Sequence, residues 1–113
     1  MNGPSRSESQ WPELTPAEVQ EVFDALYLQY PFYGQMFGHA EAVLHRVGLQ
    51  PNHMWLEDDE AFYIEFQRGL RDLTLIFPLD DEPSTALGYC SLEDEFEDFP
   101  LTDIRAIQHY LVG

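Results

Sequence analysis

Three runs of carboxylate side chains stand out in the second half of this 113-residue chain. They cover residues 57–60, 80–82 and 93–98, and the last run is interrupted by a phenylalanine. Their members are Glu57, Asp58, Asp59, Glu60, Asp80, Asp81, Glu82, Glu93, Asp94, Glu95, Glu97 and Asp98. Carboxylates at this density could bind a divalent cation, exchange protons in acid–base catalysis, or meet a basic partner.

The spacing of these residues argues against a metal site. Ca²⁺ needs oxygen ligands on a loop of fixed geometry, and no run shows the alternating Asp-x-Asp-x-Asp-Gly pattern with its turn glycine. His39-Ala40-Glu41 matches half of the zinc deaminase signature, but the Pro-Cys-x-x-Cys half is absent. We therefore expect no metal and no cofactor.

Catalysis is not expected either. Acid–base work needs a desolvated carboxylate with a shifted pKa, and consecutive acids in exposed turns do not create one. Cys90 has no base near it in the sequence, so we expect it to be a buried strand residue. Nucleotide-binding and nucleophile-elbow motifs are absent. We therefore expect no catalytic residue and no enzymatic activity.

The charge balance limits the partners. Twenty-one acids face five arginines and no lysine, which gives a formal net charge of −16. This excess disfavours direct binding to nucleic acid or to anionic membranes, and favours basic proteins. A composition of 44% apolar and 14% aromatic residues indicates a folded domain rather than a disordered acidic tail. Alternatively, the acidity serves only solubility.

Two helices are predicted in the first half. Thr15 and Glu18 have capping-box spacing with Pro16 at the first helical position, and Pro31 ends the apolar stripe that follows. A second stripe predicts a helix over 35–47, stopped by Gly48. The short joint between them predicts a helical hairpin.

Strands follow the helices. Residues 61–68 and 72–77 alternate as a β-hairpin turning at Gly69, and 85–92 is a third strand that Gly88 weakens. Residues 53–56 are either a short strand or part of a loop. Thr102 is predicted to cap a last helix.

These elements predict one α+β domain. It is a helical hairpin and a C-terminal helix packed on a three- to four-stranded antiparallel sheet, in the order α-α-β-β-β-α. Residues 1–13 are expected to be a flexible tail and 14–113 the domain. A single cysteine, no apolar run long enough to span a bilayer and no N-terminal hydrophobic segment favour the cytoplasm.

The predicted hairpin places 57–60 beside 80–82 at one end of the sheet, and 93–98 at the other end with Arg68 and Arg71. Aromatic residues lie close to the acidic runs, and Tyr63 is expected on the exposed face of its strand. We therefore predict that Tyr63 and the three runs form a partner-binding surface. Phe96 and Phe99 either join that surface or belong to the core.

Together these features indicate a small acidic protein that binds and inhibits a basic protein, such as a nuclease or another nucleic-acid-binding protein. Immunity proteins of nuclease toxins, anti-CRISPR proteins and DNA mimics are of this type as classes. Two alternatives stay open: an accessory subunit of a larger complex, and an acidic secretion-chaperone-like protein. The oligomeric state, monomer or homodimer, is also open.

Overall fold

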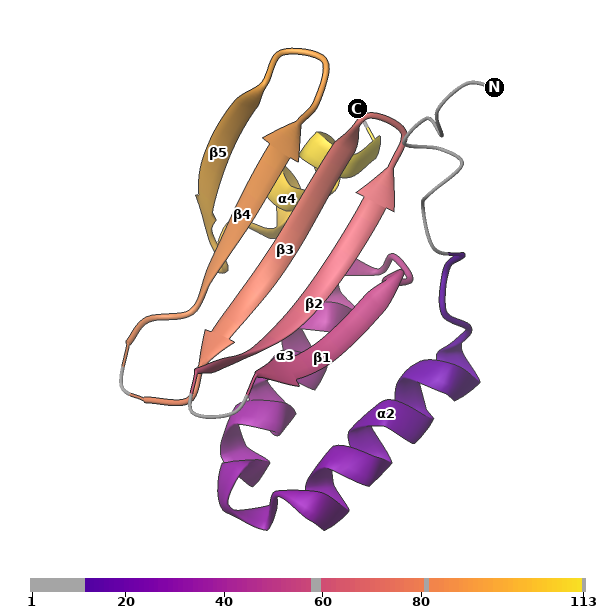
Figure 1. The fold of residues 1–113 in the computed structure, drawn as a ribbon, viewed down its shortest axis with the longest axis vertical. Coiled ribbons are helices and arrows are strands. Elements are labelled where there is room, and N and C mark those ends of the chain that lie inside the picture. The colour runs from indigo at the N-terminus through magenta and orange to yellow at the C-terminus, as the bar shows by residue number, and fades with distance from the viewer. Residues whose placement is uncertain (1–11, 58–59, 81, 113) are drawn as a thin grey trace.

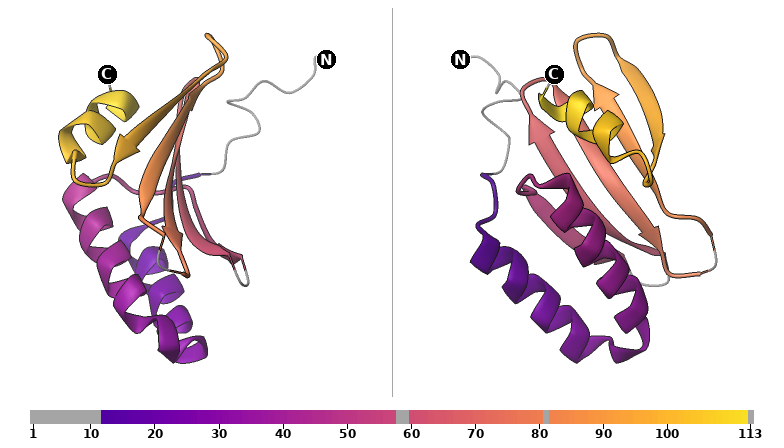
Figure 2. Two further views of the ribbon diagram at one scale, coloured as in Figure 1. Left: turned by 90° about the vertical axis from the view of Figure 1, so that its left-hand side faces the viewer. Right: turned by 180° about the vertical axis from the view of Figure 1, so that it is seen from behind.

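In the part of the chain that the structure describes, three α-helices cover one face of a five-stranded antiparallel sheet (Figures 1 and 2). The computed structural model describes residues 12–112 except 58–59 and 81. The elements are α2 (Pro16–Gln29), the 3₁₀ helix η1 (Pro31–Tyr33), α3 (Gly34–Val47), β1 (His53–Glu57), β2 (Ala61–Arg68), β3 (Arg71–Pro78), β4 (Thr85–Cys90), β5 (Glu95–Pro100) and α4 (Ile104–Val112). The α+β class is confirmed, whereas the predicted strand count of three to four is corrected to five. The expectation for residues 1–11 lies outside the described residues.

The helical hairpin forms as the sequence predicted. The Thr15 hydroxyl accepts the Glu18 N–H at 3.1 Å, and the Glu18 carboxylate accepts the Thr15 N–H at 2.8 Å, which completes the capping box. Helix α2 stops before Tyr30, and Pro31 opens η1, which leads directly into α3. Gly48 ends α3 in the left-handed conformation, with φ of 74°. None of the described helices has both the length and the apolar character that crossing a bilayer requires.

The sheet is a simple meander in which each strand pairs antiparallel with the next. Residues 53–57 form a strand, which resolves the open choice between strand and loop in favour of the strand. Strand β5 was not predicted. Its two phenylalanines, Phe96 and Phe99, point to opposite faces, so the segment shows no apolar alternation.

The core lies between the sheet and the helices. Strands β2 and β3 contribute its centre with six fully buried side chains: Phe62, Ile64, Phe66, Leu73, Leu75 and Phe77. The rings of Phe23 and Phe37 pack on Phe62 at centroid distances of 5.8 and 5.6 Å. Helix α4 covers the other half of the sheet, and Figure 2 shows all three helices on the same side.

The C-terminal helix is fixed to the sheet through Tyr110 and Gly88. A Cβ atom added at Gly88 would lie 2.7 Å from two ring atoms of Tyr110, so the glycine allows the ring to approach the strand. Arg71 holds the same residue from another side, because its guanidinium lies 5.1 Å from the ring centroid and donates to the Tyr110 carbonyl at 2.9 Å. The start of α4 differs from the prediction, since Asp103 rather than Thr102 accepts the Ala106 N–H.

We predict that Gly88→Ala destabilises the protein by about 1–3 kcal/mol, because the added methyl group must displace the buried Tyr110 ring. Gly34→Ala is the matched control, since a Cβ there meets nothing within 4 Å and the backbone is helical. Urea unfolding measures both variants. Equal stability of Gly88→Ala and the parent protein would show that Tyr110 does not need this close approach.

Candidate partner-binding surface

The first two acidic runs meet at one end of the sheet (Figure 1). Residue 57 opens the β1–β2 turn, where the Glu60 N–H donates to the Glu57 carbonyl at 3.1 Å. The Glu60 carbonyl then accepts the Leu79 N–H at 3.0 Å, and this bond joins the start of β2 to the β3–β4 turn. We call the described carboxylates of these two turns the acidic rim: Glu57, Glu60, Asp80 and Glu82. Asp58, Asp59 and Asp81 belong to the same runs but lie outside the described residues.

The third acidic run lies at the opposite end of the sheet. Its turn and the exposed part of β5 carry Glu93, Asp94, Glu95, Glu97 and Asp98, all exposed. In β5 the side chains alternate, so that Asp98 points away from the helices while Glu95 and Glu97 lie on the helix side. The structure therefore divides the predicted site into two separate regions.

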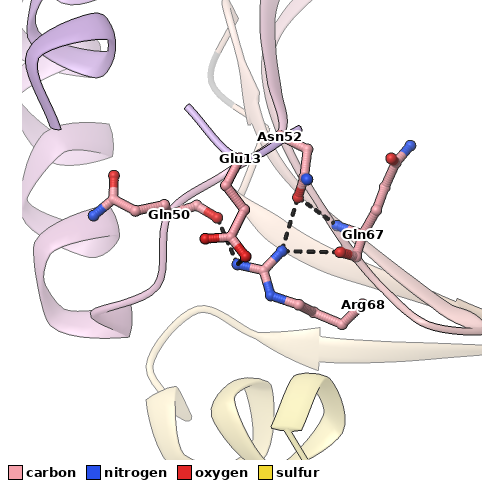
Figure 3. A network of polar contacts seen from close by, with 5 residues as sticks. All are labelled: Glu13, Gln50, Asn52, Gln67 and Arg68. Atoms are coloured by element: carbon pink, nitrogen blue, oxygen red, sulfur yellow. Dashed lines mark hydrogen bonds and ion pairs between the residues drawn. The ribbon is translucent and has the colours of Figure 1, made fainter. Parts of the chain in front are cut away.

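The arginines expected to neutralise the third run bind backbone and amide groups instead. Figure 3 shows that the Arg68 guanidinium donates to the Asn52 side chain at 2.8 Å, and to the carbonyls of Gln67 and Gln50 at 2.9 and 2.6 Å. The Arg68 guanidinium also forms an ion pair with the Glu13 carboxylate at 3.7 Å. Arg71 is bound to α4, as described above. Arg68 therefore fastens the α3–β1 connector to the sheet, and Arg71 fastens α4. Arg71 also lines the same hollow as Glu93, Glu95 and Glu97, so it lies at the end of the sheet where the sequence placed it.

The side of the sheet that faces away from the helices forms a second part of the site, which we call the open face. The strand register places sixteen half-buried or exposed side chains there: His53, Trp55, Glu57, Tyr63, Glu65, Gln67, Asp72, Thr74, Ile76, Pro78, Thr85, Leu87, Tyr89, Phe96, Asp98 and Pro100. No described helix covers them (Figure 2). Its acids are Glu57, Glu65, Asp72 and Asp98, and it carries no arginine.

Aromatic side chains gather at two places on the open face. Near the acidic rim, Trp55 stacks between His53 and Tyr63 at centroid distances of 4.5 and 4.9 Å. At the other end, Tyr89 lies 4.8 Å from Phe96. Phe96 is 68% exposed and Phe99 only 6%, so one joins the surface and the other the core.

Each tyrosine of the open face donates its hydroxyl to a carboxylate from a neighbouring turn. Tyr63 bonds Glu60 at 2.7 Å, and Tyr89 bonds Asp94 at 2.9 Å. Tyr63 was predicted from its place on the strand, whereas Tyr89 was not, although the alternation of Leu87 and Tyr89 indicates the same face. The bond to Glu60, together with burial and the charge of Glu57, raises the pKa of Tyr63 to about 12.

Two hollows of the surface lie on the helix side. One of about 620 Å³ separates α2 from α3, and another of about 720 Å³ lies between α4 and the β4–β5 hairpin. Across the described residues, no three His, Cys, Asp or Glu side chains come together as metal ligands would. Cys90 is a buried free thiol, as expected.

Comparison with known proteins gives no relative. Neither a family model, nor a curated protein, nor a solved structure matches this chain. The acidic rim and the open face are therefore interpreted from their own chemistry.

We predict that Arg68→Gln destabilises the protein by about 2–3 kcal/mol, because the buried Asn52 side chain and the Gln50 carbonyl lose a charged donor. Arg46→Gln is the control, since it removes the same charge from an exposed position on α3 and should change stability by about 0.5 kcal/mol or less. Urea unfolding compares the two. Similar losses in both variants would point to net charge rather than to the Arg68 contacts.

We predict that Tyr63 ionises at about pH 12, and that Glu60→Gln lowers this pKa because it removes the charged acceptor. The pKa is higher in the folded protein than its usual 10.0, so the stability this contact contributes is complete below pH 10 and is lost as the pH rises through 12. NMR of ring-labelled tyrosines follows both effects.

Tyr27 is the internal control for this titration, because burial and its bond to Glu41 also raise its pKa to about 12. Its titration should not change in Glu60→Gln. A Tyr63 pKa near 10 in the parent protein would contradict the assigned contact.

Proposed function

We propose that this protein is a non-enzymatic binding protein that captures and inhibits a basic, nucleic-acid-binding protein such as a nuclease. One observation carries the proposal: the Leu79–Glu60 backbone bond holds two acidic turns side by side, at the end of a sheet face whose acids have no arginine among them. The carboxylates of this surface would take the places that phosphate groups occupy on the partner.

Electrostatics favours such a partner at two stages. A net charge of −16 attracts a basic surface before contact and speeds its association. The Debye length is about 8 Å at physiological salt, so neighbouring carboxylates of the rim act together rather than singly. Arg68 and Arg71 face each other seven residues along β2 and β3 from Ala61 and Pro78, or about 23 Å from the rim end. This exceeds the Debye length, so they do little to weaken the field at the rim.

The rim is also preorganised. Strands β2 and β3 pair over eight positions, and their buried phenylalanine and leucine side chains fix the ends from which both turns leave. Binding to carboxylates on such a scaffold costs less conformational entropy than binding to a flexible acidic tail. Fixed positions of the carboxylates are what an inhibitor needs, whereas acidity that serves only solubility does not require them.

A second candidate function is that of an accessory subunit. Leu28 and Phe32 are 86% and 88% exposed near the corner between α2 and α3, where each offers an apolar side chain for contact. A permanent neighbour in a larger complex would cover them. This function predicts a partner bound at the helical corner rather than at the rim.

The test begins with capture of partners from the native host, followed by kinetics with the purified partner. We expect a basic protein whose association rate falls steeply with ionic strength, and whose binding to nucleic acid is blocked in the complex. Glu60→Gln with Asp80→Asn should lower the association rate about 3- to 10-fold at low salt.

The matched control is Glu21→Gln with Asp24→Asn, which removes two exposed carboxylates from α2. It should change the rate less than the rim pair. Equal effects of the two pairs would mean that total charge and not the rim determines binding. Loss of binding in Phe32→Ala alone would favour the accessory-subunit function.

A further inference from the structure

The open face repeats one arrangement at two places. At each, a tyrosine hydroxyl holds a turn carboxylate, and a second aromatic ring lies beside the tyrosine. The first place contains Tyr63, Glu60 and Trp55. The second contains Tyr89, Asp94 and Phe96, and Asp94 reaches its position from a backbone with φ of 53°. The two places come from different hairpins, so the repetition does not follow from neighbouring sequence.

This arrangement has the chemistry of a guanidinium site. A guanidinium stacks on an aromatic face while its N–H groups donate to a carboxylate in the same plane. The tyrosine hydroxyl occupies one lone pair of the carboxylate, which keeps further acceptor sites for a second donor. Lysine fits less well, because its ammonium is strongly hydrated and cannot stack or bind in a bidentate manner.

The register fixes the separation of the two places. Tyr63 pairs with Ile76 and Tyr89 with Asp72, which lie four residues apart on β3, or about 13 Å along the strand. Tyr63 and Tyr89 are also two strands apart, or about 9.5 Å across the sheet. The diagonal is therefore about 16 Å, and Thr74 with its neighbour Leu87 lies between its ends.

An extended chain covers this diagonal in about five residues at its usual rise of about 3.3 Å per residue. Side chains four or six residues apart point to the same side of such a chain. We propose that the open face binds an extended segment of a basic protein, with two arginines four to six residues apart occupying the two tyrosine–carboxylate sites. This inference rests on the proposed function and specifies which part of the partner is recognised.

The charges of the open face argue against other occupants. A second copy of this chain placed face to face would bring Glu57 and Asp98 towards carboxylates of the same surface, which is unfavourable. Nucleic acid would meet the same repulsion from its phosphates. An arginine-bearing segment supplies the opposite charge, and its aliphatic stems suit the half-buried Ile76 and Leu87.

The test uses the full-length protein and short synthetic peptides of neutral background sequence. One peptide carries two arginines, in versions with spacings of two, four and six residues. Companion peptides replace both arginines by lysine or by the uncharged analogue citrulline. Calorimetry should show tightest binding for arginine at spacings of four to six, and a loss of about 3- to 10-fold for lysine.

Protein variants locate the sites. Tyr63→Leu and Tyr89→Leu keep apolar side chains on the strands but remove the aromatic face and the hydroxyl. Each should weaken the two-arginine peptide about 3- to 10-fold, and the double variant should bind no better than a one-arginine peptide. If the leucine variants do not fold, the double variant Tyr63→Phe with Tyr89→Phe is used instead, because it keeps both rings and removes only the hydroxyl groups. Phe32→Ala, on the helical corner, is the control and should bind like the parent.

Three results would overturn the inference. They are equal affinity for arginine and lysine peptides, unchanged affinity in both tyrosine variants, and self-association of the parent protein that the tyrosine variants abolish. The last result would identify a second copy as the occupant. The proposed function is tested separately. A basic partner whose binding depends on the rim but not on Tyr63 and Tyr89 would support the proposed function and contradict the two tyrosine–carboxylate sites.

Discussion

Burial of one face of the β2–β3 hairpin is the interaction on which the rest of this structure depends. Six side chains of this hairpin are fully buried beneath the helices, and each such burial contributes about 1.5–3 kcal/mol. Two exposed charges 4 Å apart in water repel by only about 1 kcal/mol. The core can therefore stabilise a fold that carries far more acids than bases. The described helices pack on one side of the sheet and none of them covers the opposite face.

Two of the arginines, Arg68 and Arg71, help to keep the helix-covered side of the sheet distinct from the open face. Arg68 binds the connector between α3 and β1, and Arg71 binds the C-terminal helix, so each adds polar contacts to a segment of the scaffold. An arginine placed among the acids would have formed exposed ion pairs of little value and weakened the surface field. Internal use of these two side chains stabilises the scaffold and leaves the open face anionic.

Local signals in the sequence predicted the helices and the central hairpin well, because capping residues, a terminal glycine and strict alternation act over a few residues. The meeting of the first two acidic turns also followed from hairpin geometry. Strand β5 was missed because its side chains are exposed on both faces, so pairing with β4 rather than burial makes it a strand. The role of Gly88 could not be predicted either, since it depends on Tyr110, which is 22 positions away in the chain. The hydroxyl–carboxylate pairs likewise required coordinates, because a tyrosine on an open strand gives no sign of which turn it will reach.

The last strand has a consequence for the behaviour of the molecule at high concentration. A meander ends in two unprotected borders, and an exposed border is where chains add to one another and grow into fibrils. Here the outer strand carries Glu95, Glu97 and Asp98 and finishes in Pro100. An incoming copy in antiparallel or parallel orientation would set these acids close to their own kind, and the proline offers no N–H for the ladder. The acidic composition of this strand thus also disfavours pairing of the sheet with its own copies.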